Sequence, residues 1–321
     1  MNQRSNTDPG LIRQLIVSKS EELGFDDIGF SNADFLGEHA EHTERWLANG
    51  FQGSMHYLEK NREKRYDPRL LIENTKTVVT VLQNYFPEEK LSEADNYKIA
   101  KYAYGVDYHT LIRSKMNQIL KAVEETYGSF QARVFTDSAP VLDRAWAEKC
   151  GLGFIGKNTC LIHPRKGSFF FIGHIFLPFA LEADTNQVTD YCGTCRRCID
   201  ACPTQALVAP HQLDARKCIS YLTIEHRGEL PNEMRNRFND WIFGCDICQD
   251  VCPWNRFAKP HREPLFALSP ALKTMRKNDW HSLDKAKYKM LFKDSAVERT
   301  KFEGLKRNID FIANIEKDIN H

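Results

Sequence analysis

The stretch from Cys192 to Cys252 holds eight of the ten cysteines in the chain. Its first part reads Cys192-Gly-Thr-Cys195-Arg-Arg-Cys198-Ile-Asp-Ala-Cys202-Pro203. Its second part has a lone Cys218 and then reads Cys245-Asp-Ile-Cys248-Gln-Asp-Val-Cys252-Pro253. A run of closely spaced cysteines whose last member precedes a proline is the ligand pattern of paired 4Fe–4S clusters. The stretch therefore predicts a module that carries two such clusters.

The spacing also predicts which cysteines share a cluster. In bacterial ferredoxins of this pattern, the fourth cysteine of a run ligates the other cluster. We therefore expect one cluster on Cys192, Cys195, Cys198 and Cys252. The other cluster is expected on Cys202, Cys218, Cys245 and Cys248, so that two clusters use all eight thiols.

Zinc and disulfides are the alternatives for such a stretch. Zinc sites usually pair two C-x2-C knuckles, and the longer run fits them poorly. Disulfides need an oxidising compartment, whereas the chain opens with polar residues after Met1 and shows no apolar signal region. No apolar run has the length of a membrane span. We therefore expect a cytoplasmic protein, away from membranes, whose cysteines bind metal.

The overall charge excludes a protein that binds nucleic acid through its net charge. The 321 residues have a formal net charge of +1, with 27% charged and 42% hydrophobic residues, as in ordinary globular proteins. A local surplus does occur, because residues 259–317 hold 14 Lys and Arg against 8 Asp and Glu, a difference of +6. Such a surplus is either a solvated helical face or a phosphate-binding patch.

The chain as a whole is typical of an α+β protein in three parts. Residues 1–182 are expected to form an α+β domain, residues 183–258 a ferredoxin-like domain, and residues 259–321 a short basic helical region. Helices are predicted over residues 8–24, 41–48, 107–127 and 141–150. Strands are predicted over 27–30 and 78–82, within 98–105, over 133–135, and as a hairpin of 159–163 with 168–177.

The N-terminal part lacks the common nucleotide-binding motifs. It has no G-x-G-x-x-G fingerprint and no P-loop. Asp107-Tyr-His109 begins like the D-x-H-x-x-G corrinoid signature, but Ile112 replaces the glycine. We therefore interpret His109 as an ordinary residue of a first helical turn, and a corrinoid bound here would lack a histidine ligand from the protein.

Asp137 is the acid that most resembles a catalytic group. It ends an apolar strand, among small residues and just before a proline. It is either a helix N-cap or a proton donor whose desolvated carboxyl group stays protonated near neutral pH. Lys157 is either a partner for a phosphate or amide group or a surface lysine. Cys150 and Cys160 lack ligand spacing and are expected to be small core residues.

Several stretches resemble those of the epoxyqueuosine reductases. The longest is Thr136-Asp-Ser-Ala-Pro140 with Glu148-Lys-Cys-Gly-Leu-Gly-Phe-Ile-Gly-Lys-Asn158. Shorter ones are Arg65-Tyr-Asp-Pro68, Tyr104-Gly-Val-Asp-Tyr-His109, Cys218-Ile-Ser-Tyr-Leu-Thr223 and Phe243-Gly-Cys-Asp-Ile-Cys248. The resemblance extends from about residue 8 to about residue 310, and the reductive dehalogenases are related corrinoid and iron–sulfur proteins.

The resemblance implies a reaction on tRNA, the last step of queuosine biosynthesis. Enzymes of this family reduce the epoxide of epoxyqueuosine at the wobble position of tRNA to queuosine, with cobalamin and two 4Fe–4S clusters. An aspartate protonates the departing oxygen, and the matching residue here is Asp137. The electron donor is unidentified, and we expect a monomer. Longer family members continue into helical repeats that help to hold tRNA, whereas this chain ends at His321.

The resemblance also implies contacts with the cofactor and the substrate. From the matching motifs and strands, the expected cobalamin contacts are Arg65, Ala100, Asp137, Leu161, Ile172, Ser220, Cys245 and Asp246. His226 and Arg227 fall where the family meets tRNA. The competing hypotheses are a reductive dehalogenase of small organohalides and an electron-carrier or tRNA-binding module without corrinoid.

Overall fold

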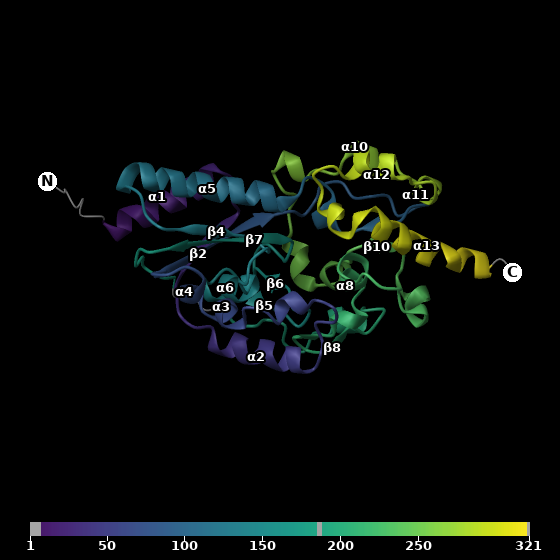
Figure 1. Ribbon diagram of the computed structural model, residues 1–321, viewed down its shortest axis with the longest axis horizontal. Coiled ribbons are helices and arrows are strands. Elements are labelled where there is room, and N and C mark those ends of the chain that lie inside the picture. The colour runs from purple at the N-terminus through teal and green to yellow at the C-terminus, as the bar shows by residue number, and fades with distance from the viewer. Residues whose placement is uncertain (1–7, 185–187, 320–321) are drawn as a thin grey trace.

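An antiparallel sheet of four strands lies between two layers of helices in the first half of the chain (Figure 1). The computed structural model describes residues 8–184 and 188–319. The strands run in the order β1 (Asp27–Asn32), β2 (Thr77–Asn84), β7 (Phe170–Leu177) and β4 (Arg133–Phe135). The central strands β2 and β7 are almost fully buried, which explains why β2 is a nearly continuous apolar run.

One face of the sheet is covered by two helices, α1 (Pro9–Glu22) and α5 (Tyr108–Tyr127) (Figure 1). Each begins at an aspartate, because the side chains of Asp8 and Asp107 accept hydrogen bonds from the backbone N–H two residues ahead. Ile16 and Met116 belong to the apolar core that these helices share with the sheet. Both predicted helices are therefore confirmed.

The other face carries α6 (Asp143–Lys149), whose Trp146 packs with Phe135 and Phe176 of the sheet. Three further helices lie on this side in Figure 1: α2 (Gly37–Ala48), α3 (Arg62–Tyr66) and α4 (Pro68–Leu71). Helix α2 begins four residues earlier than predicted, and α6 begins two residues later.

The predicted hairpin of residues 159–163 and 168–177 is wrong. Strand β6 (Leu161–Ile162) pairs with β5 (Phe154–Ile155), whereas β7 pairs with β2 and β4. Strand β2 pairs along the whole of β7, and β4 pairs with residues 174–176, so β7 has partners other than β6. The isolated bridge between His163 and Gly167 closes only the turn that precedes β7. The strand predicted within residues 98–105 is short: β3 (Lys98–Ile99) pairs in parallel with β10 (Trp241–Phe243).

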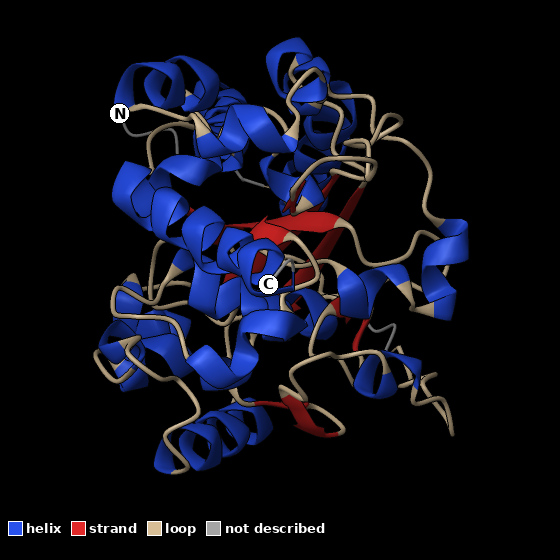
Figure 2. Ribbon diagram, turned by 90° about the vertical axis from the view of Figure 1, so that its right-hand side faces the viewer, coloured by secondary structure: helices blue, strands red, loops and turns tan. Residues whose placement is uncertain are grey.

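The cysteine-rich stretch consists of short elements joined by loops. These are α7 (Arg197–Asp200), β8 (Leu207–Ala209), β9 (Gln212–Leu213), α8 (Ile219–Ile224) and α9 (Ile247–Asp250). Four helices follow: α10 (Pro270–Lys273), α11 (Lys277–His281), α12 (Lys285–Phe292) and α13 (Lys301–Ile319). Figure 2 shows the side of the molecule where α13 ends.

The C-terminal helices share a core with two earlier segments. Trp280 and Leu305 pack in one cluster with Tyr97 and Phe243. The amide of Asn308 donates to the carbonyl oxygens of Thr223 and Ile242, both at 2.9 Å. Because one core draws on residues from all three predicted parts, the boundaries at 182 and 258 stay a prediction. In the part of the chain that the structure describes, no helix has the length and apolar character needed to cross a membrane.

The contact between β1 and the end of α6 leaves no room for a side chain at Gly29. A Cβ atom there would lie 2.3 Å from the carbonyl oxygen of Cys150. Gly29→Ala is therefore expected to lower the free energy of unfolding by about 1–3 kcal/mol, measured by anaerobic chemical denaturation. Gly37→Ala is the matched control, because its Cβ would meet nothing closer than 3.9 Å. Equal stability of both variants would contradict this packing.

Candidate active site and cluster module

The structure brings together the first predicted set of cysteines. Burial raises the pKa of Cys198, and the nearby Cys252 and Cys195 add to the rise. Burial also raises the pKa of Cys192 to about 11, with Cys252 again among its charged neighbours. These four thiols therefore lie near one another, as their spacing predicts, while their role as iron ligands stays a prediction.

The second predicted set gathers in the same way. Burial raises the pKa of Cys218, next to Cys202, and burial raises the pKa of Cys245, next to Cys218 and Cys202. A hydrogen bond with Cys160 and then burial raise the pKa of Cys248, whose neighbours include Cys245 and Cys218. Since burial disfavours the thiolate form, these groups become stable thiolates only when metal binds them.

The arrangement of the thiols fits clusters of several irons. All ten cysteines are free thiols. Among the described residues, no three His, Cys, Asp or Glu side chains converge as the ligands of one metal ion. A 4Fe–4S cluster asks for a different arrangement, because each of four thiolates binds its own iron. Two sets of four neighbouring thiols meet that need.

The segment after α6 holds the loops that carry both sets. Lys157 Nζ donates to the carbonyl oxygens of Gly193 at 2.5 Å and Cys195 at 3.1 Å. The backbone N–H of Lys157 points to Cys192 Sγ at 3.4 Å, and the Asn158 amide donates to the Cys248 carbonyl at 3.2 Å. Lys157 is therefore bound to the loop of the first set and is not a free surface lysine.

Cys150 and Cys160 differ in their surroundings. Cys150 is buried, and its thiol lies 3.2 Å from Thr80 Oγ1, so its prediction as a core residue is confirmed. Cys160 lies beside Cys248, a contact that its sequence spacing did not indicate.

Asp137 stands at the end of β4 in an uncommon backbone conformation. Its φ is 50°, in the left-handed region that Asp tolerates better than most residues. The side chain is 65% exposed, so a substrate can reach it. The N-cap alternative is wrong, because the residue at the N-cap of α6 is Leu142 and no side chain caps that end.

The start of α5 supplies the hydrogen-bond partners of Asp137. The Tyr108 hydroxyl donates to Asp137 Oδ2 at 2.5 Å, and His109 Nε2 lies 3.8 Å from the same oxygen. Although its side chain is exposed on one side, the protein packed around Asp137 and the Asp143 carboxylate raise its pKa, whereas Tyr108 and His109 lower it. Sequence reasoning missed Tyr108 and treated His109 as ordinary, although both lie in the motif Tyr104–His109.

Aromatic side chains link the surroundings of Asp137 to the second set of cysteines. The Tyr102 ring lies 6.3 Å from that of Tyr108 and 6.0 Å from that of Phe243, measured between centroids. Phe243 stands two residues before Cys245. Burial raises the pKa of Tyr102 well above its ordinary value, so this phenol stays neutral. Asp137 and the second thiol set therefore share one aromatic wall.

Three of the predicted cofactor contacts meet at this wall. The backbone N–H of Ala100 donates to the Phe243 carbonyl at 2.8 Å. Gly244 lies so close that an added Cβ would stand 2.5 Å from the Ala100 Cβ. The adjacent Cys245 and Asp246 are therefore held against Ala100.

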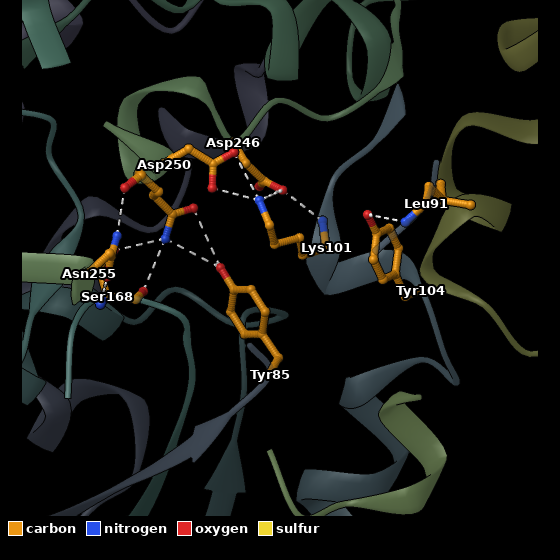
Figure 3. A network of polar contacts seen from close by, with 9 residues as sticks. Tyr85, Leu91, Lys101, Tyr104, Ser168, Asp246, Asp250 and Asn255 are labelled. Carbon is orange, nitrogen blue, oxygen red and sulfur yellow. Dashed lines mark hydrogen bonds and ion pairs between the residues drawn. The ribbon is translucent and has the colours of Figure 1, made fainter. Parts of the chain in front are cut away.

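Lys101 and two carboxylates fix this junction, as Figure 3 shows. The backbone N–H of Lys101 donates to Asp246 Oδ2 at 2.8 Å, and Lys101 Nζ lies 3.2 Å from Asp246 and 2.7 Å from Asp250. Burial works against the charge of Lys101, but the two carboxylates outweigh it and raise its pKa. The lysine therefore stays charged and joins the N-terminal half of the chain to α9.

The other predicted cofactor contacts are Arg65, Ile172, Leu161 and Ser220, which lie on four different elements. Arg65 is only 7% exposed, and among the described residues its Nε has no hydrogen-bond partner. The Ile172 carbonyl accepts from Thr136 Oγ1 at 2.9 Å, directly beside Asp137. Leu161 is buried on β6, and Ser220 lies in the first turn of α8.

His226 and Arg227 lie in the loop after α8, close to the C-terminal helices. Arg227 donates to the carbonyl oxygens of Ile224 at 2.9 Å and Arg299 at 2.8 Å. Arg307 donates to the His226 carbonyl at 2.8 Å. The loop therefore brings Arg227 together with Arg299 and Arg307, two of the basic residues in the C-terminal surplus.

A double set of cluster-type thiols, joined by aromatic side chains to an acid with a raised pKa, defines an iron–sulfur oxidoreductase. Family models support this class: one described as "4Fe-4S double cluster binding domain" matches residues 191–255. Another, "Epoxyqueuosine reductase QueG, DUF1730", matches residues 65–138.

Curated relatives cover nearly the whole chain. The epoxyqueuosine reductase of Cellulophaga algicola is 51% identical over 93% of this chain and 97% of its own length. That of Pseudomonas aeruginosa is 41% identical over 94% of this chain and 83% of its own length. A crystal structure of epoxyqueuosine reductase with an epoxyqueuosine-modified tRNA-Tyr stem loop has a TM-score of 0.89 at 27% identity, over 98% of this chain and 84% of that one. The chain belongs to the epoxyqueuosine reductase family.

The contact between Tyr108 and Asp137 predicts a change in pH dependence. If the protonated acid is the active form, the rate falls as the pH rises through the pKa of Asp137. Tyr108→Phe removes a hydrogen bond that stabilises the carboxylate, so the pKa rises further and the falling limb moves to higher pH by about one unit. The pH profile of single-turnover reduction measures this shift. Tyr127→Phe, at the other end of α5, is the control, and an unmoved limb in Tyr108→Phe contradicts the assignment.

Proposed function

We propose that the chain reduces epoxyqueuosine to queuosine in tRNA, with two 4Fe–4S clusters and cobalamin as cofactors and Asp137 as proton donor. The observation that carries the proposal is a protonatable aspartate on the same aromatic wall as the second thiol set. The relatives named for this reaction cover nearly the same length of chain, which supports the substrate. The net change adds two electrons and two protons and releases one water.

The residues around Asp137 fit a corrinoid with polar side groups. Arg65 is a buried donor that lacks an acceptor on its Nε among the described residues, and the amide groups at the rim of cobalamin are such acceptors. Ala100, Leu161, Ile172, Ser220, Cys245 and Asp246 complete the proposed contact set. When bound, cobalamin would supply a nucleophilic metal centre next to the epoxide, and the clusters would supply the electrons.

The protein's own side chains position the proton donor and protonate the departing oxygen. The Tyr108 hydroxyl donates to Oδ2 of Asp137, and within the described part of the chain the other carboxyl oxygen accepts no hydrogen bond, so the substrate could approach it. A pKa above the ordinary value favours the protonated carboxyl group, which would give its proton to the departing epoxide oxygen. One solved relative, from Bacillus subtilis, has a catalytic loop with an aspartate swung out of its active site, which agrees with a movable acid on the loop after β4.

The surface near α8 is the proposed place for tRNA. Arg227 is exposed, and Arg299 and Arg307 lie beside it. Arginine suits contacts with phosphates and stacked bases. His226 and Arg227 are therefore proposed to meet the anticodon loop, while the wobble nucleotide leaves the stack and approaches Asp137.

Deletion of the gene tests the proposed reaction in the cell. Cells that lack the protein and any paralogue are expected to accumulate epoxyqueuosine in place of queuosine in tRNA, because the epoxide is no longer reduced. Mass spectrometry of the nucleosides from digested tRNA measures both. Unchanged queuosine would contradict the proposal and favour a dehalogenase or a carrier module.

Asp137→Ala tests the proton donor. The variant is expected to bind both clusters and cobalamin, seen in anaerobic absorption spectra, and to lose turnover by a factor of about 10² or more. Asp143→Ala is a comparison variant that removes a neighbouring carboxylate. Loss of the clusters in Asp137→Ala would mark the residue as structural instead.

A further inference from the structure

An open groove of about 790 Å³ borders Cys252, a member of the first thiol set. Its walls include Lys90 from the N-terminal half, Arg197 from α7 and Arg256 after α9. We propose that this groove docks the electron donor of the enzyme, a small acidic protein that carries one electron at a time. The inference rests on the proposed function, because it assigns the source of electrons for the first cluster.

The charges of the groove favour an acidic partner. Three cations, Lys90, Arg197 and Arg256, line it, and among the described residues no carboxylate forms an ion pair with them. The two acids of the wall are already paired. Asp250 binds Lys101 at 2.7 Å, and Asp200 lies 3.5 Å from Arg196. The groove therefore presents an uncompensated positive charge, which attracts and orients an acidic protein.

Aromatic side chains beside the groove suit a protein partner. Arg256 lies over the Phe257 ring at 4.3 Å, and Phe257 is 37% exposed. Tyr191, just before Cys192, is 52% exposed and lies 5.8 Å from the Trp254 ring. Exposed aromatic and arginine side chains are the residues that contribute most to protein–protein binding.

The wall of the groove is held in place before any partner binds. Asn255 accepts from the backbone N–H of Ser168 at 2.7 Å and donates to the Gln249 carbonyl at 2.7 Å. Gln249 in turn donates to the Ser168 carbonyl at 3.0 Å. Figure 3 shows Asn255 and Ser168 next to Asp250 in this network. A surface fixed in this way loses little conformational entropy on binding.

The position of the groove matches the direction of electron flow. Cys252 belongs to the first thiol set, whereas the second set lies beside Ala100 and the aromatic wall that reaches Asp137. None of the described residues that line the groove belongs to the proposed tRNA surface or contacts Asp137. The groove and the proposed tRNA surface therefore share no residue.

Each docking event transfers one electron. The carrier loses the electron, and the first cluster gains it and passes from its 2+ to its 1+ state. Two such events supply the two electrons that reduce one epoxide. With a flavodoxin as the carrier, the hydroquinone becomes the semiquinone, and no proton needs to cross the interface.

Rapid mixing of the holoenzyme with reduced acidic flavodoxin tests the inference without tRNA. The loss of cluster absorbance and the rise of the semiquinone band report the transfer, so the readout does not depend on epoxide reduction. In the double variant Lys90→Glu/Arg256→Glu, the second-order rate at low salt is expected to fall by roughly tenfold or more. The dependence on ionic strength is expected to flatten as well.

Two kinds of control separate docking from other effects. Lys121→Glu reverses one charge, half of the charge change in the double variant, at an exposed residue of α5 and is expected to leave the rate unchanged. Dithionite and reduced methyl viologen, which carry opposite charges, are both expected to reduce the clusters of the double variant to the same final extent as in the unchanged protein, so a damaged cluster is recognised. An unchanged rate with flavodoxin in the double variant overturns the proposal. Weakened binding of tRNA in place of slower reduction also overturns it and makes the groove a nucleic-acid site.

Discussion

Eight half-buried thiols gather into two sets of four, and the surrounding segments are arranged around them. Burial raises the pKa of Cys198, Cys218 and Cys245, so their thiolates need a metal to be stable. The stretch has only short helices and strands of its own. Lys157 and Asn158 fix its loops by hydrogen bonds to their carbonyl oxygens. Iron–sulfur clusters would fix them further by binding their cysteine thiolates.

The position of Cys218, far upstream of Cys245, connects the cysteine-rich stretch to other segments of the chain. The residues between Cys218 and Cys245 include α8 and β10, and β10 pairs with β3 of the N-terminal half. Asn308 of α13 then binds the backbone of both added elements. A cluster on the second thiol set would therefore lie where three segments of the chain meet. From there, Tyr102 extends the contact to the surroundings of Asp137.

The sequence predicts features that depend on local chemistry. Helices α1 and α5 follow aspartate caps, and the strand β2 follows a β-branched run, so each is recognisable from a few neighbouring residues. The two thiol sets follow from spacing in the same way. The hairpin failed because β7 takes two partners from distant parts of the chain, which the local turn residues do not reveal.

The contacts of the candidate site also join distant segments, which local sequence does not reveal. Asp137 was recognisable from its place after an apolar strand, but its partner Tyr108 lies 29 residues away on another element. The contact of Lys101 with Asp246 spans 145 residues. Such pairs are set by the packing of helices against the sheet and not by any short pattern. A motif indicates which acid is a candidate, and the fold determines which hydroxyl group alters the pKa of that acid.

Iron and sulfide analysis with electron paramagnetic resonance, on the anaerobically reconstituted chain and on its Cys218→Ser variant, tests whether the two thiol sets bind two 4Fe–4S clusters. Two clusters require roughly eight iron and eight sulfide per chain, with spectra of two interacting centres after reduction. The variant is expected to lose the signal of the second cluster and keep that of the first. Zinc in place of iron, or a variant that keeps both signals unchanged, would rule out two 4Fe–4S clusters on these two thiol sets.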